Sequence, residues 1–298
     1  MKKLYIILAF TSFLLSTSCT EEITIEVESG DTMVGVEAYF SDEFKQHETI
    51  LSYTSDFSNH DGIRMVSGAT VYITDGIDTI YYHEDDQNKG HYLTNPVAGK
   101  RNTLYRLCID LDDLDGEPVQ LFSESILADN VDCIDSLVIK PYNGNNDTVM
   151  TVFFGDTIEW VYPYFQSLPD PNIVYMPLIY KNDTLLTDTL NQQMMIPVGG
   201  YAGYYINGPE MQAQNKEIPI YYFKKSDLRE GDRIRAGLQS IPTDYLYFYY
   251  TVSMSTGNNP LMGAPANVTT NIQPTNKAVG WFMTASVTSA ETVFIDNH

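Results

Sequence analysis

The sequence predicts a mainly β protein made of two β-sandwich-like domains in tandem, with one short helix in the second domain. Composition is the first observation, because 22 Tyr, 19 Gly and 14 Pro with only 19% charged residues are typical of turn-rich β proteins. The second is the alternation of apolar and polar residues along the predicted strands. The third is that turn dipeptides such as Asp75-Gly76 and Asp115-Gly116 recur about every ten residues, a spacing typical of β-sandwiches.

Length and net charge limit the number of domains and the classes of partner. A chain of 298 residues is long enough for about two domains. Its 39 acidic and 17 basic residues give a net charge of −22. Because an acidic surface repels phosphate groups, this charge excludes general nucleic-acid binding and also argues against a basic patch for anionic lipids.

The first eighteen residues have the features of a lipoprotein signal peptide. Lys2 and Lys3 are followed by an apolar run over residues 4–15, by the small residues 16–18 and then by Cys19. The apolar run is too short to span a bilayer, which favours a cleaved signal. Cys19 is therefore the predicted lipid attachment site, where two or more acyl chains (palmitate among them) would hold the protein stably on a membrane. An ordinary secretory signal with a coincidental Cys is the alternative.

Residues 19–133 are predicted to form an N-terminal immunoglobulin-like β-sandwich. Its strands alternate apolar with polar residues and are separated by Gly and Asp turns. The predicted strands are residues 23–27, 34–38, 69–73, 79–82, 90–93, 104–110 and 119–126.

Residues 134–298 are predicted to form a C-terminal β-rich domain with a helix near 243–256. Pro242-Thr243-Asp244 is typical of a helix start, and the aromatic residues Tyr245, Phe248 and Tyr249 recur at helical spacing. The β-favouring residue types of this segment leave a strand as the alternative. The strands predicted in this domain are residues 137–139, 149–154, 160–165, 174–180, 184–186, 218–223, 234–238 and 279–287.

Several short motifs occur in an order that resembles one known family. After the lipoprotein signal they are residues 69–76 (Ala-Thr-Val-Tyr-Ile-Thr-Asp-Gly), 90–92 (Gly-His-Tyr), 99–100 (Gly-Lys) with 104–107 (Leu-Tyr-Arg-Leu), 135–137 (Asp-Ser-Leu), 226–227 (Ser-Asp), and 259–260 (Asn-Pro) through 270–272 (Thr-Asn-Ile) to 278–282 (Ala-Val-Gly-Trp-Phe). This order resembles the Bacteroidetes lipoprotein family that carries the domain of unknown function DUF4249, and the resemblance covers about residues 19–290. The chain departs from the family at residues 273–277, where a Gly-rich segment is usual.

The resemblance implies a cell-surface role in nutrient uptake. Genes of this family commonly lie beside TonB-dependent outer-membrane receptors, so the partner implied is such a receptor. The segment Thr20-Glu21-Glu22 directly after Cys19, with its two acidic residues, also resembles the surface-export signal of Bacteroidetes lipoproteins, and a solvated polar tether is the alternative. The expected location is therefore the outer membrane, lipid-anchored and facing the extracellular side. The family has no established catalytic residues, and the resemblance implies none here.

Metal and cofactor signals are sparse in the sequence. None of the five His residues has the spacing of a helix-borne zinc site, and no phosphate-binding Gly-rich loop or nucleophile elbow occurs. His83 and His91 flank an acidic turn, which favours a solvated turn over a metal site. Residues 110–117 are the densest acidic cluster but do not fit an EF-hand in register, so a calcium site of another type stays an alternative to a charged hairpin tip. We therefore expect no metal and no cofactor.

Tyrosine clusters are the best candidates for ligand binding. Tyr201, Tyr204 and Tyr205 lie in a Gly-rich run over residues 199–205 that does not favour a regular element. Tyrosine offers a flat apolar ring with a polar tip, which suits peptide or glycan ligands. The alternative is that these tyrosines serve as core and rim residues of the β domains.

Two functions from different classes compete. The first is a non-enzymatic accessory or ligand-binding lipoprotein of a TonB-dependent uptake system, and the missing catalytic signatures favour it. The second is a surface-anchored hydrolase acting on glycan or peptide in an aromatic cleft. Its paired carboxylates could come from Asp156, Glu159, Asp170 and Asp183.

The two cysteines left after Cys19 could form a disulfide in an oxidising compartment. The hairpin at Asp115-Gly116 places Cys108 opposite a residue near Leu121, and Cys133 lies well beyond that point along the chain. A bridge would require a chain reversal at the domain boundary. We therefore favour two separate thiols, with Cys133 buried at the joint between the domains.

Overall fold

A computed structural model describes residues 31–54, 62–129, 133–141, 155–165, 174–187, 197–198, 201–202, 206–207, 219–256 and 268–296. Contacts divide the chain into two compact units, Met1–Asp31 and Thr32–His298. All the elements described below belong to the second unit. Cys19 and the signal peptide lie outside the described residues.

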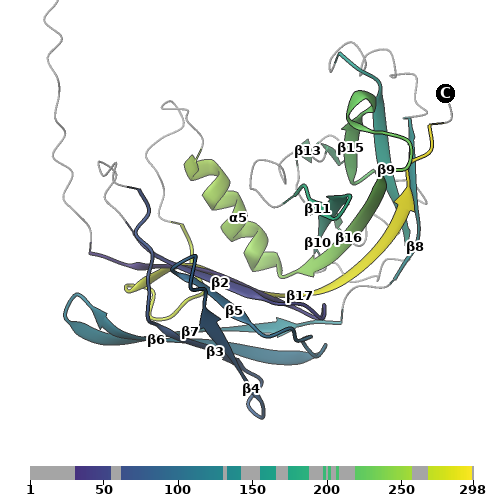
Figure 1. Cartoon of the computed structure of the whole chain (residues 1–298). Coiled ribbons are helices and arrows are strands. Elements are labelled where there is room, and N and C mark those ends of the chain that lie inside the picture. Colours follow the sequence, from purple (N-terminus) through teal and green to yellow (C-terminus); the bar gives the residue numbers. More distant parts are fainter. Residues whose placement is uncertain are drawn as a thin grey trace, which may run out of the picture. The chain divides into compact units, whose positions relative to one another are not determined.

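The fold is mainly β, as the sequence predicts. Its strands are β1 Val34–Ser41, β2 Glu48–Tyr53, β3 Thr70–Thr74, β4 Thr79–Glu84, β5 His91–Thr94, β6 Thr103–Leu114, β7 Glu117–Leu127, β8 Ile134–Pro141, β9 Ile158–Phe165, β10 Val174–Lys181, β11 Thr184–Leu185, β12 Pro197–Val198, β13 Tyr201–Ala202, β14 Ile206–Asn207, β15 Tyr221–Lys224, β16 Arg233–Ile241 and β17 Ala278–Val293. A short 3-10 helix spans Lys225–Asp227. The predicted helix is confirmed as α5, Thr243–Thr256 (Figure 1).

Within the described residues, no helix is long and apolar enough to cross a membrane.

The first hydrophobic core forms between two groups of strands from the N-terminal half. One group is β1, β2 and β5 with the first part of β17, and the other is β4, β3, β6 and β7. The alternation of apolar and polar residues places the apolar side chains in the core here. In β1 these are Val34, Val36, Ala38 and Phe40, which all point inward. The largest fully buried side chains of this core are Phe40, Leu51, Ile73, Tyr92, Leu107, Ile109, Leu121, Leu127 and Phe282.

The second hydrophobic core is built from residues after position 133. Strands β10 and β16 contribute from the large sheet, and β15, β9 and β8 form a separate three-stranded sheet. The buried members include Ile134, Leu137, Val161, Tyr175, Ile179, Ile220, Phe223, Ile234, Ala236, Leu238 and Phe294. Two cores with opposed strands correspond to the sandwich-like character that the sequence predicts.

Strand β17 runs through both halves of the fold. Its first half pairs in parallel with β1, from Val34 opposite Ala278 to Ser41 opposite Ala285. Its second half pairs antiparallel with β16. Figure 1 shows β17 as the long yellow strand that runs from the region of β1 to that of β16. The pairing is thus continuous across the predicted boundary at residue 133, while the division into two domains stays a prediction.

Polar contacts fix the middle of β17 to the first core. The Asp42 carboxylate accepts a hydrogen bond from the Val287 backbone N–H at 2.8 Å and from Arg101 Nε at 2.6 Å. The Ser125 hydroxyl accepts the Thr284 backbone N–H at 3.1 Å. Because these contacts lie near the point where β17 passes from β1 to β16, they hold the strand in register with both partners.

The two described cysteines are separate thiols, as favoured, but the burial predicted for Cys133 is not observed. Cys108 pairs with Phe122, one residue from the predicted Leu121, and Tyr72 lies opposite it on the other side. Cys108 is buried at this position between the two neighbouring strands. The prediction that Cys133 is buried is wrong, because it lies exposed in the connection just before β8.

Candidate functional site

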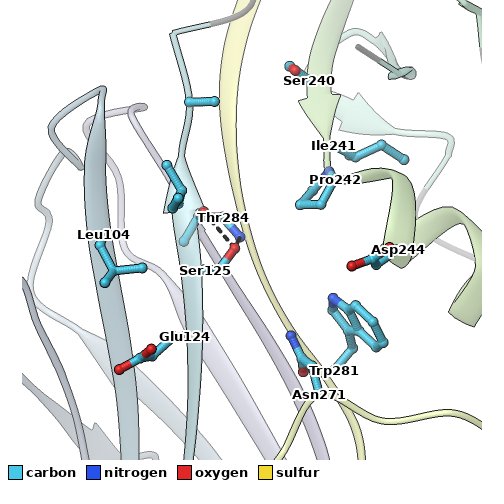
Figure 2. A pocket seen from close by; sticks show the side chains of 12 residues that line it. Leu104, Glu124, Ser125, Ser240, Ile241, Pro242, Asp244, Asn271, Trp281 and Thr284 are labelled. Atoms are coloured by element: carbon cyan, nitrogen blue, oxygen red, sulfur yellow. Dashed lines mark hydrogen bonds between the residues drawn. The ribbon is translucent and has the colours of Figure 1, made fainter. Parts of the chain in front are cut away.

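An open hollow of about 440 Å³ lies beside β7, across from the end of β16 and the start of α5 (Figure 2). Its lining residues come from both halves of the sequence and are Leu104, Glu124, Ser125, Ile126, Ala128, Ser240, Ile241, Pro242, Asp244, Asn271, Trp281 and Thr284. This volume lies within the range of about 300–1,000 Å³ that is usual for small-ligand sites. We therefore take the hollow as the candidate functional site.

One wall of the hollow carries exposed apolar side chains. Leu104 of β6 lies directly opposite Ile126 of β7, and their exposed fractions are 49% and 59%. Their neighbours on the same outer face are Arg106 and Glu124, so the face is otherwise polar. Apolar cross-strand neighbours left in solvent on such a face are typical of a contact surface.

The opposite wall is organised by Trp281 of β17. Its indole ring lies 5.2 Å from the ring of Phe248 and 6.2 Å from that of Tyr245, measured between ring centroids. Both partners belong to the aromatic stripe predicted for α5, and Tyr249 of the same stripe is buried. Burial raises the pKa of Tyr245 to about 12, with a smaller contribution from the nearby carboxylate of Glu37. Trp281 is thus held by rings that pack on the helix side.

The polar side chains of the hollow differ in their hydrogen-bond and ion-pair partners. The hydroxyl groups of Ser125 and Thr284 form a hydrogen bond of 2.9 Å. The side-chain amide of Asn271 binds the backbone of Phe282 through both its oxygen and its nitrogen. The Glu124 carboxylate lies 3.4 Å from Arg106 Nη1. Asp244 lies in the first turn of α5, where a carboxylate is favoured by the helix dipole. In Figure 2 Asp244 and Trp281 lie on one side of the hollow and Leu104 lies on the other.

The edge of β7 presents backbone groups on the side of the hollow. Phe122 uses its N–H and C=O to bind Gln273, at 2.9 and 2.8 Å, on the edge that faces away from β6. Because backbone groups alternate along an antiparallel strand, those of Glu124 and Ile126 point the same way. Asn271, two residues before Gln273, lines the hollow at this edge.

The tyrosines predicted to bind ligand lie almost entirely outside the described residues. Tyr201 begins the short strand β13, and its backbone pairs with Val198. Tyr204 and Tyr205 lie outside the described residues, as does Cys19. The hollow itself was not predicted. The signal that could have indicated it is the apolar pair at 104 and 126, where the strand alternation calls for polar side chains.

Two of the carboxylates considered for hydrolysis, Asp156 and Asp183, take part in hydrogen bonds or ion pairs that hold local structure. Asp156 accepts hydrogen bonds from the backbone N–H groups of Thr157 and Ser226, at 2.7 and 2.9 Å. Asp183, in the turn between β10 and β11, forms an ion pair with Arg233 at the start of β16. Glu159 is buried in β9, and Asp170 lies outside the described residues. The structure does not bring Asp156 and Asp183 to the hollow.

The acidic residues considered for metal binding form hydrogen bonds within turns and between strands. Asp113 accepts the Gly116 N–H at 2.7 Å, and Asp110 accepts the Gln120 amide at 2.7 Å. His91 Nδ1 lies 2.7 Å from the carboxylate of Glu48. In the ranges that the structure describes, no three metal-binding side chains come together.

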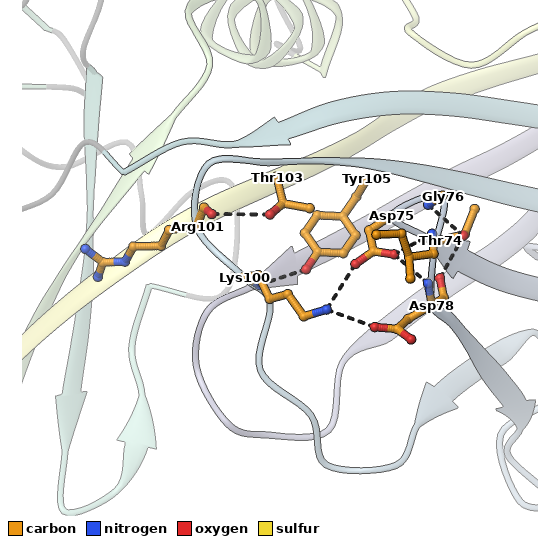
Figure 3. Close-up of polar contacts among 9 residues, drawn as sticks. Thr74, Asp75, Gly76, Asp78, Lys100, Arg101, Thr103 and Tyr105 are labelled. Carbon is orange, nitrogen blue, oxygen red and sulfur yellow. Dashed lines mark hydrogen bonds and ion pairs between the residues drawn. The ribbon is translucent and has the colours of Figure 1, made fainter.

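Motif residues from three separate segments meet at one turn (Figure 3). The Asp75 carboxylate caps the β3–β4 turn by accepting the N–H groups of Ile77 and Asp78, at 2.9 and 2.6 Å. Lys100 Nζ binds Asp75 at 3.2 Å and Asp78 at 2.9 Å. Tyr105 completes the cluster, because its hydroxyl accepts the Lys100 backbone N–H at 2.7 Å. The N–H groups and Lys100 lower the pKa of Asp75 to about 2.

The last motif, around Asn271 and residues 278–282, also has a structural role. The Asn271 amide accepts the Phe282 N–H at 2.9 Å and donates to the Phe282 C=O at 2.8 Å, as a neighbouring strand would. Gly280 adopts φ +110°, and a Cβ there would lie 2.0 Å from the Val36 carbonyl oxygen. Only glycine therefore allows β1 and β17 to lie this close together.

Comparison with known families gives one match that covers most of the chain. Residues 20–291 match the model of the family described as a domain of unknown function, DUF4249. The matched range includes the motif segments between residues 69 and 282 and begins directly after Cys19. A search of curated proteins found no match to this chain.

Proposed function

This chain belongs to the DUF4249 family, and from that premise we propose that it is a non-enzymatic cell-surface lipoprotein. In this proposal it serves as the accessory or ligand-binding component of a TonB-dependent nutrient uptake system. The observation that carries the binding role is the open hollow, in which Leu104, Ile126 and Trp281 line a space of ligand size. A site of this kind suits reversible capture of a ligand.

The distribution of side-chain roles supports binding over chemistry. Asp75, Lys100 and Asn271, which belong to the family-like motifs, are engaged in holding turns and strands. The exposed side chains of the lining are two apolar and two acidic ones, Leu104, Ile126, Glu124 and Asp244. A fixed scaffold with an exposed apolar recess is what a capture protein needs before it passes a ligand to a transporter.

The proposed anchor is the lipid on Cys19. Cys19 precedes Val34, the first residue of β1, by fifteen positions in the sequence. Two or more acyl chains on one protein give stable attachment, whereas one chain gives marginal attachment. The TonB-dependent partner would then meet the protein within the same membrane plane.

The Cys19→Ala variant tests the anchor. We expect the variant to leave the membrane fraction and to incorporate no labelled palmitate, because the sulfur that would carry the lipid is missing. Membrane fractionation with immunoblotting measures this, and Cys133→Ala, which removes an exposed thiol elsewhere, should remain on the membrane. The anchor proposal fails if Cys19→Ala stays on the membrane at the wild-type level.

A further inference from the structure

We propose that the hollow between β7 and the start of α5 binds a short basic peptide segment. The inference deepens the proposed function and rests on it, because it names the ligand class of the same binding component. Three features carry it: the charge of the lining, its apolar walls and the backbone groups at the edge of β7.

Charge complementarity selects a cationic ligand. Among the described residues that line the hollow, Glu124 and Asp244 are the charged ones, and both are acidic. Arg106 lies close to Glu124 and offsets part of its charge, which leaves Asp244 as the main contact for a cation. The net charge of −22 adds long-range attraction for basic ligands.

The apolar walls select a ligand that also carries hydrocarbon. Leu104 and Ile126 on one wall and Trp281 and Pro242 on the other can cover an aliphatic side chain or the stem of a lysine. An isolated inorganic cation would leave these surfaces in water. The site therefore suits an apolar residue next to a basic one.

The edge of β7 favours a peptide over a sugar. The backbone N–H and C=O groups of Glu124 and Ile126 point to the side of the hollow, and the described residues provide no backbone partner for them. A peptide segment in extended form offers complementary groups at matching spacing. Its main chain would bind the edge while its side chains reach Trp281 and Asp244.

Trp281 gives a direct readout of binding. The chain has two tryptophans, and the other, Trp160, is buried in the second half of the fold. In the full-length Trp160→Phe variant, purified in detergent, the emission comes from Trp281 alone. We would titrate it with a blocked lysyl-valyl-lysyl-valine tetrapeptide, with the glutamyl-valyl equivalent and with cellotetraose. Titration calorimetry on the unsubstituted chain gives the same comparison if Trp160→Phe does not fold.

The expected result is saturable binding of the basic peptide, with at least tenfold weaker binding of the acidic peptide and the sugar. Asp244→Asn should weaken the basic peptide about fivefold, as expected for one partly screened ion pair. Its control is Asp86→Asn, an exposed aspartate on a distant turn. Ile126→Ser should weaken it about tenfold through lost apolar contact, whereas Ile77→Ser, at the exposed β3–β4 turn, should not.

Three results would overturn the inference. They are equal binding of basic and acidic peptides, a response to the sugar alone, and basic-peptide binding that Asp244→Asn and Ile126→Ser leave unchanged. Absence of peptide binding by a protein that still co-purifies with a receptor would remove this inference and leave the proposed function intact. Peptide binding without any receptor would count against the uptake role and leave the hollow as a peptide site.

Discussion

Asp75 shows how one side chain can account for a sequence motif. The carboxylate caps its own turn with backbone N–H groups and also binds Lys100 from a segment 25 positions along the chain. The motif residues Asp75, Lys100 and Tyr105 are therefore best explained by the structure of this turn. The same contacts hold the pKa of Asp75 at about 2 and raise that of Lys100.

The depressed pKa of Asp75 predicts a specific pH dependence of stability. A carboxyl group with a lowered pKa in the folded state stabilises the fold above its ordinary pKa of 3.8. That contribution is lost as the pH falls from about 4 to about 2, because the folded-state group is then protonated.

We expect Asp75→Asn to be less stable than wild type at pH 7 and the difference to shrink toward pH 2. Urea unfolding at a series of pH values measures it. Asp86→Asn, on another turn, reports the effect of removing one negative charge. A difference between wild type and Asp75→Asn that stays constant from pH 7 to pH 2 would contradict this role.

At the scale of elements, the long strand β17 connects the two halves of the fold. It pairs with β1 at one end and with β16 at the other, and the close approach to β1 depends on Gly280. The Asp42 carboxylate and the Ser125 hydroxyl secure the region between the two pairings. This strand brings Trp281 beside residues of β6 and β7 that lie far away in the sequence.

Gly280→Ala tests the parallel pairing. A Cβ at this position would collide with the Val36 carbonyl, so we expect a loss of about 4 kcal/mol or failure to fold. Gly116→Ala is the matched control: its φ is +91° but its surroundings are open, so only the left-handed strain of about 1 kcal/mol applies. Thermal and urea unfolding compare the two. Equal, small effects for both variants would show that β1 and β17 are not so close.

The sequence allowed most individual elements to be predicted. The strand alternation indicated β1, β3 and β6, and the turn dipeptide at Asp115-Gly116 indicated the β6–β7 hairpin. The helical spacing of Tyr245, Phe248 and Tyr249 indicated α5 in spite of their β-favouring types. These signals are local, because each depends on residues within one or two turns or strands.

The hollow could not be predicted because it depends on contacts between distant segments. Leu104 and Ile126 become neighbours through the hairpin, but Trp281 joins them only because β17 passes β7 near Ser125. Cys133 illustrates the same limit: its exposure follows from where the chain runs before β8, which strand periodicity does not specify.

At the scale of the whole molecule, the protein comprises a proposed lipid anchor at Cys19, a β scaffold and, in the described residues, an open recess. The anchor and the receptor partner are proposals that rest on Cys19 and on the family to which the chain belongs. The scaffold and the recess are features of the described residues. Together they describe a protein that would hold a ligand at the cell surface beside a transporter.

Co-isolation from outer membranes tests whether this protein works with a TonB-dependent receptor. The tagged full-length protein is extracted in a mild detergent, and the bound proteins are identified by mass spectrometry. An unrelated outer-membrane lipoprotein with the same tag serves as the control. We predict enrichment of one TonB-dependent barrel receptor with this protein and not with the control. Recovery of the lipoprotein without such a receptor, in repeated extractions and after cross-linking on intact cells, would contradict the proposed role in TonB-dependent uptake.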